Sequence, residues 1–337
     1  MILRMNLGAD SYDIVLERGA LGRAKDLLRL DRKVLIVTDS GVPAKYAESV
    51  AAACREAYIH VIPQGEASKC FATYEELLYR LVEHGFTRTD CVVAVGGGVV
   101  GDLAGFVAAS FMRGIDFYNV PTTVLSQIDS SIGGKVAIDF GGYKNLVGAF
   151  YQPKKVLIDP EVLSTLPTRQ IANGLAEAIK MALTSDPVLF DIFEKGDPLA
   201  EIDTVIKRSL RIKQQVVEED EKEAGLRKIL NFGHTLGHAI ESTAGFADLY
   251  HGECVALGMI PMVDPSIRDR LIAVLRRVGL PTDYAADTNT VFAAMAHDKK
   301  AAGSKITVIY VNQIGTFDMQ TVSLDMLRSR LLQHGKE

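Results

Sequence analysis

The sequence predicts an N-terminal α/β domain with a parallel sheet over residues 1–158, followed by an all-α, or at least mainly helical, domain over residues 159–337. Three observations support this. A chain of 337 residues is too long for one simple core. Its first half alternates short apolar runs with helical patterns, which is typical of βαβ units. After Asp159 strand-like runs become rare, so we place the boundary at Ile158-Asp159-Pro160.

The predicted strands of the first half are apolar runs that end in polar or glycine-rich turns. They are Lys33–Asp39, Ala57–Ile62, Cys91–Val95 and Asp116–Val120, and Tyr74–His84 has helical periodicity between them. Ligands of such sheets bind at the carboxyl ends of the strands. We therefore look for functional residues just after these runs.

The second half is dominated by helical periodicity. Helices are predicted over Ile171–Leu183, Asp203–Glu219, Ile229–Glu241 and Leu271–Val278, and a β-like run at Ser304–Val311 precedes a terminal helix. The run from Lys213 to Arg227 also looks helical. Pro261 should end or kink the helix that follows His251, which predicts a truncated helical hairpin before Pro265.

Composition limits the class of protein. The net charge is −5 and no basic block occurs, which disfavours nucleic acid as a partner. The four cysteines form no CxxC pair, which favours a reducing cytoplasm over a disulfide framework. The N-terminus has no apolar signal-peptide core, and no run of 18 apolar residues exists, so we expect a cytoplasmic protein without a membrane span.

A glycine-rich turn follows the third predicted strand, in Val92-Val-Ala-Val-Gly-Gly-Gly-Val-Val-Gly-Asp102. Glycines such as Gly97 and Gly98 let a backbone approach a phosphate, and the following helix supplies N–H donors, as in Rossmann-like domains. The spacing differs from GxGxxG, so a tight turn without a ligand is equally open. Asp102 could cap the helix or bind a ligand hydroxyl.

Two further segments suit the same ligand. Thr122 and Thr123 follow the next strand, although one of them could instead cap a helix. The segments Asp129–Lys135 and Gly141–Asn145 are glycine-bounded and contain Lys135 and Lys144. They could hold an anionic, hydroxyl-rich ligand, or simply be solvated loops.

Histidines and a carboxylate indicate a metal site. His234 and His238 lie four apart, on one helical face, and His251 follows in His251-Gly-Glu253. Glu177 and Lys180 share a face upstream. Two imidazoles and one carboxylate are a sensible set of metal ligands, and spacing alone favours His234 with His238 as the pair. Arg227 and Asn231, four apart and beside the histidines, could clamp a carboxylate or phosphate, although most of the charged run before them is typical of a solvated face. The other histidines, His60, His84, His297 and His334, lack such context.

These motifs together resemble the 3-dehydroquinate synthase family. The resemblance runs from about Asp39 to Lys300 and rests on motifs that occur in order: Gly96–Asp102, Pro121–Thr123, Asp129–Lys135, Lys144-Asn145, Ala176–Lys180, Asn231–His238 and His251–Glu253. It implies a dehydroquinate synthase-like fold, with bound NAD and one Zn²⁺ or Co²⁺. The family is usually homodimeric.

The resemblance also implies roles for individual residues. The metal ligands would be Glu177, His234 and His251, which makes His238 a catalytic acid/base instead of a ligand. Other catalytic residues would be Lys180, Glu223, Arg227 and Asn231. NAD contacts would be Asp39, Glu66, Lys69, Gly97, Gly98, Asp102, Thr122, Thr123, Lys135, Lys144 and Thr165. Substrate contacts would be Asp129, Lys135, Lys144, Asn145, Lys180, Lys213, Arg227, Asn231, Lys299 or Lys300, and Arg113, which would reach a neighbouring subunit.

The implied reaction converts 3-deoxy-D-arabino-heptulosonate 7-phosphate to 3-dehydroquinate and phosphate in the shikimate pathway of aromatic amino acid biosynthesis. It proceeds by transient oxidation, phosphate β-elimination, re-reduction and intramolecular aldol closure. The alternatives are another sugar-phosphate cyclase of the valiolone or inosose synthase type, a metal-dependent alcohol or glycerol dehydrogenase, and a non-enzymatic nucleotide-binding module. Retention of Arg227, Asn231 and a late lysine favours the carboxylated substrate.

Overall fold

The computed structural model describes residues 1–244, 249–283, 290–292 and 305–332. The chain divides into two compact units. Unit 1 comprises Met1–Pro167 and Lys213–Glu221, and unit 2 comprises Thr168–Ile212 and Lys222–Glu337. One helix, α7 (Ile202–Glu219), contributes residues to both units. The expected boundary at residue 159 stays a prediction.

Unit 1 contains the predicted parallel sheet. Its seven strands follow the order β1 (Ile2–Met5), β2 (Tyr12–Leu16), β9 (Lys155–Ile158), β6 (Asp116–Pro121), β5 (Cys91–Gly96), β3 (Lys33–Asp39) and β4 (Glu56–Ile62). Every neighbouring pair is parallel except β1 with β2. The four strands predicted from apolar runs are β3 to β6. The short strands β1, β2 and β9 were not predicted.

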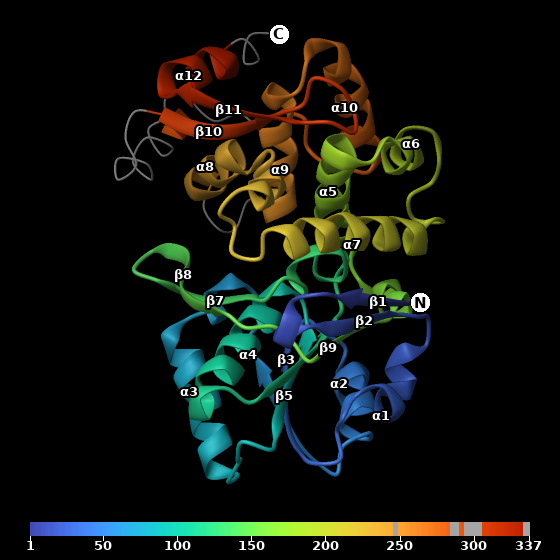
Figure 1. Ribbon diagram of the computed structural model, residues 1–337, viewed down its shortest axis with the longest axis vertical. Helices are drawn as coiled ribbons and strands as arrows, with labels where there is room; N and C mark the ends of the chain where they lie inside the picture. Colours follow the sequence, from blue (N-terminus) through green and yellow to red (C-terminus); the bar gives the residue numbers. More distant parts are fainter. Residues whose placement is uncertain (245–248, 284–289, 293–304, 333–337) are drawn as a thin grey trace. The chain divides into compact units, whose positions relative to one another are not determined.

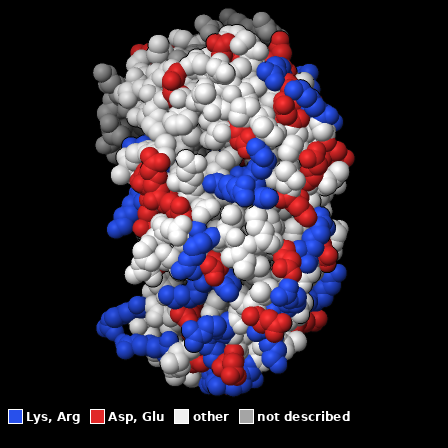
Figure 2. All heavy atoms as spheres, turned by 45° about the vertical axis from the view of Figure 1, so that its right-hand side comes forward, with Lys and Arg blue, Asp and Glu red and all other residues white. Residues whose placement is uncertain are grey.

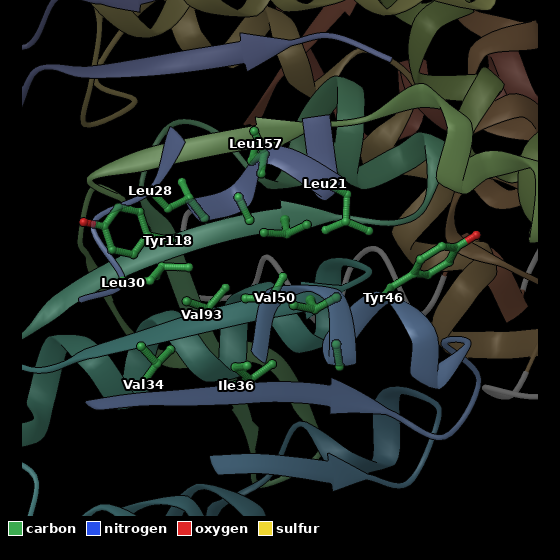
Figure 3. Close-up of a cluster of buried hydrophobic side chains, with 14 of the residues drawn as sticks. Leu21, Leu28, Leu30, Val34, Ile36, Tyr46, Val50, Val93, Tyr118 and Leu157 are labelled. Atoms are coloured by element: carbon green, nitrogen blue, oxygen red, sulfur yellow. The ribbon is translucent and has the colours of Figure 1, made fainter. Parts of the chain in front are cut away.

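Helices cover both faces of this sheet (Figure 1). On one face α1 (Ala24–Leu27) and α2 (Ala44–Ala51) pack, and on the other α3 (Phe71–Glu83) and α4 (Gly98–Ser110). Successive side chains of β3 point to opposite faces, as in any strand. Val34 and Ile36 therefore enter the cluster drawn in Figure 3, whereas Leu35 and Val37 enter the cluster beneath α3 and α4. A strand buried on both faces reads as a continuous apolar run.

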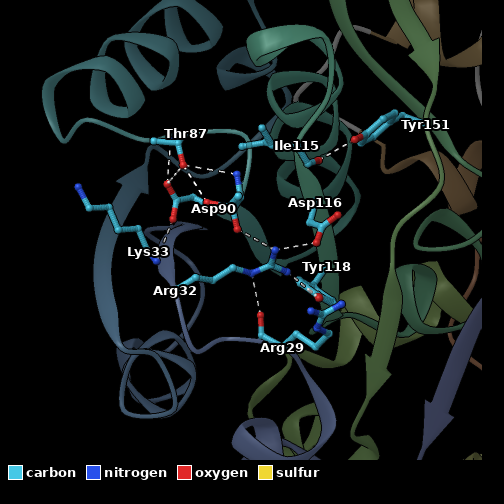
Figure 4. Close-up of polar contacts among 10 residues, drawn as sticks. Arg29, Arg32, Lys33, Thr87, Asp90, Ile115, Asp116, Tyr118 and Tyr151 are labelled. Atoms are coloured by element: carbon cyan, nitrogen blue, oxygen red, sulfur yellow. Dashed lines mark hydrogen bonds and ion pairs between the residues drawn. The ribbon is translucent and has the colours of Figure 1, made fainter.

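A network of polar side chains connects the amino ends of the sheet strands β3, β5 and β6 (Figure 4). The Arg32 guanidinium donates to Asp116 Oδ2 at 2.7 Å, to Tyr118 OH at 2.8 Å and to the Thr89 carbonyl at 3.0 Å. Asp90 accepts from the backbone N–H of Lys33 at 3.2 Å. These contacts lie at the edge where β3, β5 and β6 begin. A ligand of such a sheet binds at the opposite edge, where the carboxyl ends of the strands lie.

A β-hairpin continues unit 1 after a short π-helical segment, η5 (Ser126–Ser130). Strands β7 (Lys135–Phe140) and β8 (Tyr143–Phe150) pair antiparallel across Gly141 (φ +61°) and Gly142 (φ +84°). Positive φ at both turn residues is the requirement of a tight hairpin. The segments expected to be glycine-bounded loops are therefore partly strand. Their polar side chains indicated solvated loops, but their backbone N–H and C=O groups pair with each other in the hairpin.

Unit 2 is largely helical, as predicted. Among the described residues, its helices are the first part of α7, α5 (Thr168–Ser185), α6 (Pro187–Lys195), α8 (His234–Ala244), α9 (His251–Met259), α10 (Pro265–Arg277) and α12 (Leu324–Leu332). It is not all-α. The β-like run forms β10 (Lys305–Tyr310), which pairs with an unpredicted β11 (Asp318–Ser323). The two strands satisfy each other's backbone groups, which a single apolar run could not reveal.

Two helical predictions for the second half of the chain were wrong at their ends. The run expected to stay helical through Arg227 ends at Glu219, and Glu223 has a left-handed φ of +60°. The expected helix Ile229–Glu241 is divided into a 3₁₀ turn, η7 (Leu226–Asn231), and α8 by Gly233 (φ +77°). Pro261 ends α9 as predicted: the helix stops at Met259 and a 3₁₀ turn follows.

The surface of the described residues carries both charges. Figure 2 shows lysine and arginine interspersed with aspartate and glutamate on one face, without one sign dominating it. Among the described residues, no helix combines the length and the apolar character that crossing a bilayer requires.

Candidate functional site

Unit 2 brings together three side chains expected to be metal ligands. Glu177 lies in the middle of α5 and is fully buried. Its Oε1 atom is 3.7 Å from Nε2 of His234 and 3.6 Å from Nε2 of His251. His234 and His251 are the first residues of α8 and α9, and their ring centroids are 5.2 Å apart. Residues separated by up to 74 positions therefore converge on one carboxylate oxygen.

Glycines explain how the helices come close enough for this convergence. A Cβ on Gly258 of α9 would lie 2.0 Å from the carbonyl oxygen of Gly233, and one on Gly237 would lie 3.0 Å from the carbonyl of Cys254. A Cβ on Gly252 would lie 2.0 Å from the Asn173 carbonyl of α5. Only glycine permits such backbone approach. The glycines beside the histidine motifs thus set the positions of the imidazoles.

A second set of contacts holds the start of α9, and the sequence analysis missed it. Arg169 makes a bidentate pair with Glu253, at 2.7 and 2.8 Å, and its guanidinium lies 4.4 Å from the Tyr250 ring centroid. Glu253 also accepts from the Tyr250 N–H at 2.8 Å. Asn173 Oδ1 accepts from the Gly252 N–H at 2.6 Å. His251 lies between Tyr250 and Gly252, whose N–H groups are both hydrogen-bonded to side chains, so its backbone is held on both sides.

The electrostatics of the cluster favour an ionised carboxylate. Burial would raise the pKa of Glu177, but the charges of Lys180, with which it forms an ion pair, and of His234 and His251 hold that pKa well below its usual range. Burial, with Lys180 nearby, lowers the pKa of His234. Burial opposes protonation of His251 too, but its carboxylate partners Glu177 and Glu241 raise its pKa to about 9.

The donor set fits a divalent cation. Lys180 pairs with Oε2 of the fully buried Glu177, whereas Oε1, the oxygen that faces both imidazoles, accepts no hydrogen bond from any described residue. Buried carboxylates require compensation, which a metal ion supplies. Two tetrahedral ligands at zinc bond lengths lie roughly 3.4 Å apart, close to the Oε1–Nε2 separations described above. The ligand atoms of His234, His238 and His251 also lie within 4.8 Å of one another, so the pair favoured by spacing is near as well.

Of the other residues expected to be functional in unit 2, one lies beside the histidine cluster and three lie in or next to the 3₁₀ turn η7. His238 is exposed, one turn after His234, with its ring 5.3 Å and 5.8 Å from those of His234 and His251. Asn231 donates to Glu223 at 2.6 Å, so these two candidates are in contact. Arg227 is buried in η7. Lys299 and Lys300 lie outside the described residues.

Unit 1 contains the expected strand, glycine turn and helix. Gly97 is the N-cap of the 13-residue α4, and no side chain caps its first turn. A Cβ on Gly97 would lie 3.2 Å from Thr123, and one on Gly98 would lie 3.2 Å from Ser130. The free N–H groups of this helix end at the carboxyl edge of the sheet suit a phosphate. Asp39, at the end of neighbouring β3, accepts from the Gly41 N–H at 2.8 Å.

Three expected cofactor residues form one ion-pair group around the buried Lys69 beside this turn. Lys69 Nζ lies 2.8 Å from Asp102 Oδ2 and 3.4 Å from Glu66 Oε1. Asp102 therefore pairs with a lysine and does not cap α4. Burial opposes the charge of Lys69, but Asp102 and Glu66 outweigh burial and raise its pKa. Burial also raises the pKa of Asp102, against the effect of Lys69.

The two threonines differ in role. Thr123 and Ser126 exchange backbone-to-hydroxyl hydrogen bonds, each 3.1 Å long, so Thr123 begins the helical segment that follows, as one alternative foresaw. Thr122 is buried, with its N–H on the Gly96 carbonyl at 2.9 Å. Thr165 Oγ1 lies 2.9 Å from Tyr46 OH.

The expected substrate contacts of unit 1 are partly brought together. Lys213 of α7 lies 2.6 Å from Asp129 Oδ1 and donates to the Asp129 carbonyl, also at 2.6 Å. Lys135 and Lys144 lie on the hairpin, where Asn145 has a φ of +55° and donates its N–H to Asp139. Arg113 is exposed and also has a positive φ, +68°.

The fold and these sites define an α/β protein with a nucleotide-binding type of turn and a helical unit with a candidate metal centre. Family models for the N-terminal and C-terminal parts of 3-dehydroquinate synthase match residues 59–173 and 174–301. A 3-dehydroquinate synthase of Streptococcus pneumoniae is 40% identical over 355 residues, covering 99% of this chain and 100% of the relative. One from Lactococcus lactis is 40% identical over 354 residues, covering 98% and 99%. The chain belongs to the 3-dehydroquinate synthase family, whose members are phosphate-eliminating lyases.

Solved structures agree with this fold. A 2-deoxy-scyllo-inosose synthase complexed with carbaglucose-6-phosphate, NAD⁺ and Co²⁺ matches with a TM-score of 0.88 and 25% identity, over 99% of both chains. A 2-epi-5-epi-valiolone synthase from Streptomyces hygroscopicus with NAD⁺ and Zn²⁺ matches at 0.86 and 29%, over 96% of both. A probable glycerol dehydrogenase from Sinorhizobium meliloti shares only the fold, at 0.65 and 17% identity over 95% of both chains.

Proposed function

We propose that this protein converts 3-deoxy-D-arabino-heptulosonate 7-phosphate into 3-dehydroquinate and phosphate, with NAD and one Zn²⁺ or Co²⁺ ion as cofactors. The observation that carries the proposal is the 40% identity, over the full length, to relatives named 3-dehydroquinate synthase. The cyclase structures with NAD⁺ and Co²⁺ or Zn²⁺ support the choice of cofactors. We further propose that the protein is cytoplasmic and forms a homodimer; light scattering of the purified protein would test the homodimer.

The uncapped N-terminus of α4 supports binding of the NAD pyrophosphate, because its N–H groups are free to donate to phosphate oxygens. Gly97 and Gly98 allow close approach there. The half-buried carboxylate of Asp102, held by Lys69, would accept from a ribose hydroxyl. When bound, NAD supplies reversible hydride removal, and the metal supplies Lewis acidity.

Glu177, His234 and His251 would hold the metal. Their mutual distances support this set, and His238 then remains available for proton transfer. Its exposed imidazole lies within a turn of His234, near enough to exchange a proton with a substrate hydroxyl or carbon held at the same centre. Lys180 would lie beside the substrate while its charge keeps Glu177 ionised.

Cationic and amide side chains would orient the anionic substrate. Arg227 offers a planar, always charged guanidinium that suits a carboxylate, and Asn231 adds an amide donor. Lys213 is held in place by Asp129, so its ammonium is preorganised for a substrate oxyanion. Holding the chain in one conformation favours both loss of phosphate and closure of the carbocycle, because reacting atoms stay near one another.

The test is phosphate release from the heptulosonate phosphate by the purified protein with NAD and Zn²⁺ or Co²⁺, before and after chelation. We expect chelator-sensitive release without accumulation of NADH, and loss of release in His234→Ala. Sedoheptulose 7-phosphate and glycerol serve as competing substrates. Turnover of sedoheptulose 7-phosphate alone would replace the proposal by another cyclase, and stoichiometric NADH from glycerol would replace it by a dehydrogenase.

A further inference from the structure

The imidazole of His251 contacts carboxylates through both of its nitrogens. Its Nε2 atom lies 3.6 Å from Glu177 Oε1, and its Nδ1 atom lies 3.3 Å from Glu241 Oε2. Glu241 belongs to α8, seven residues after His234 and three after His238, and hence lies on the same helical face. Only 8% of its surface is exposed, so this carboxylate is directed into the cluster and not into solvent.

His234 is arranged in the same way as His251, with an oxygen acceptor next to Nδ1 and Glu177 next to Nε2. Its Nδ1 atom lies 3.1 Å from the Phe232 carbonyl oxygen, while its Nε2 atom faces Glu177. A carbonyl can only accept, so Nδ1 of His234 must carry the proton. In both rings an acceptor at Nδ1 selects the tautomer whose Nε2 has a free lone pair, and in both rings Nε2 faces the same carboxylate oxygen.

We propose that Glu241 is a positioning residue of the metal centre: it accepts a hydrogen bond from Nδ1 of His251 and thereby aims an unprotonated Nε2 at the ion. The inference rests on the proposed function, since it takes Glu177, His234 and His251 as ligands. It adds a fourth residue that touches neither the ion nor the substrate. The Arg169–Glu253 pair fixes the backbone of His251, and Glu241 fixes the rotation of its ring.

The experiment measures Zn²⁺ binding directly, by calorimetric titration of the metal-stripped, full-length protein. Glu241→Ala should raise the dissociation constant about 10- to 100-fold, as loss of an outer partner of a ligating histidine does. Glu241→Gln keeps an oxygen acceptor without the charge and should stay within a few-fold of wild type. Ser242→Ala, at the neighbouring exposed position of α8, is the matched control and should bind as wild type does.

A further variant separates the effect of the carboxylate's position from the effect of its charge. It also allows the test to be made if the alanine variant does not fold. Glu241→Asp keeps the charge but withdraws the carboxylate by one methylene, so it should weaken Zn²⁺ binding by about tenfold. Co²⁺-loaded protein supplies a second readout, because its visible spectrum reports ligand geometry and should change in Glu241→Asp but not in Glu241→Gln.

The outcomes separate this inference from the proposed function. If wild type binds no Zn²⁺, the proposed metal centre fails and Glu241 with it. If wild type binds Zn²⁺ and Glu241→Asp binds equally well, the positioning role is overturned while the metal centre stands. A loss in Glu241→Gln as large as that in Glu241→Ala would also overturn it, because the charge of Glu241 and not its hydrogen-bond acceptor would then be the cause.

Discussion

Replacing Gly258 by alanine should weaken metal binding without touching any ligand. The added Cβ would lie 2.0 Å from the Gly233 carbonyl oxygen and 2.8 Å from the Gly237 N atom. Because real Cβ atoms essentially never come within 3.0 Å of such atoms, α9 and α8 must separate by about 1 Å. Metal ligands tolerate deviations of only about 0.2 Å, so His251 would be displaced from His234 by several times that tolerance.

The expected magnitudes follow from this displacement. Overpacking of this kind costs about 1–3 kcal/mol, which lowers the melting temperature of a unit this size by roughly 2–12 °C. The Zn²⁺ dissociation constant should rise at least tenfold, measured by calorimetry on metal-stripped protein. Gly22→Ala is the matched control, because nothing lies within 4 Å of a Cβ there and its φ is not positive.

The reasoning is refuted if Gly258→Ala melts and binds Zn²⁺ as the Gly22→Ala control does. Such a result would mean that the two helices can move apart without disturbing the imidazoles. A variant that loses stability but keeps wild-type affinity would refute only the link between helix separation and ligand geometry.

Three further predictions concern stability and can be tested by thermal unfolding. Lys69→Met should cost about 3 kcal/mol at pH 7, because it removes a buried ammonium and leaves the half-buried Asp102 carboxylate without the lysine that pairs with it. The pKa of Asp102 is already raised, so this cost should shrink as the pH falls and the carboxyl takes up a proton; Lys195→Met, in an exposed pair, should change little. Asp186→Ala removes the N-cap of α6 and the Arg208 pair and should cost about 1 kcal/mol. Burial opposes ionisation of Asp186, but Arg208 and the capped N–H groups lower its pKa. The stability that ionised Asp186 contributes is therefore complete above the ordinary aspartate pKa of about 3.9 and is lost below it. A stability difference between wild type and Asp186→Ala that does not change with pH would contradict the assignment. Zn²⁺ at 100 times its dissociation constant should stabilise the wild type by about 2.7 kcal/mol, and Glu177→Gln should abolish the effect.

The parallel sheet was predictable because its central strands are buried on both faces. Cys91–Val95 is apolar throughout, and the following glycines mark its end, so strand and turn could be read together. The hairpin strand Tyr143–Phe150 is mostly exposed, with no clear apolar alternation. Hairpin pairing with the adjacent strand Lys135–Phe140, not a side-chain pattern, makes that segment a strand, and the sequence alone did not reveal it.

The residues of the candidate metal centre could be proposed from the sequence, but the contacts between their side chains could not. Spacing placed His234 and His238 on one face, yet it could not tell which ring faces Glu177, because that depends on how α5 packs. Glu241 was missed although its offset from the histidines was a usable signal. The pairing of Lys69 with Asp102 spans 33 residues and depends on the sheet, so no local pattern could indicate it.

The division of α7 between the units has a consequence for synthesis of the chain. Unit 1 needs residues Lys213–Glu221, which supply Lys213 to Asp129, Glu218 to Asn6 and Glu221 to Gln152. A ribosome delivers the sheet first and these partners only after all of Thr168–Ile212. The nascent N-terminal unit must therefore wait for a late segment before its polar groups are matched, so it cannot mature strictly in the order of translation. A truncated gene that stops at Pro167 would encode the same incomplete state permanently.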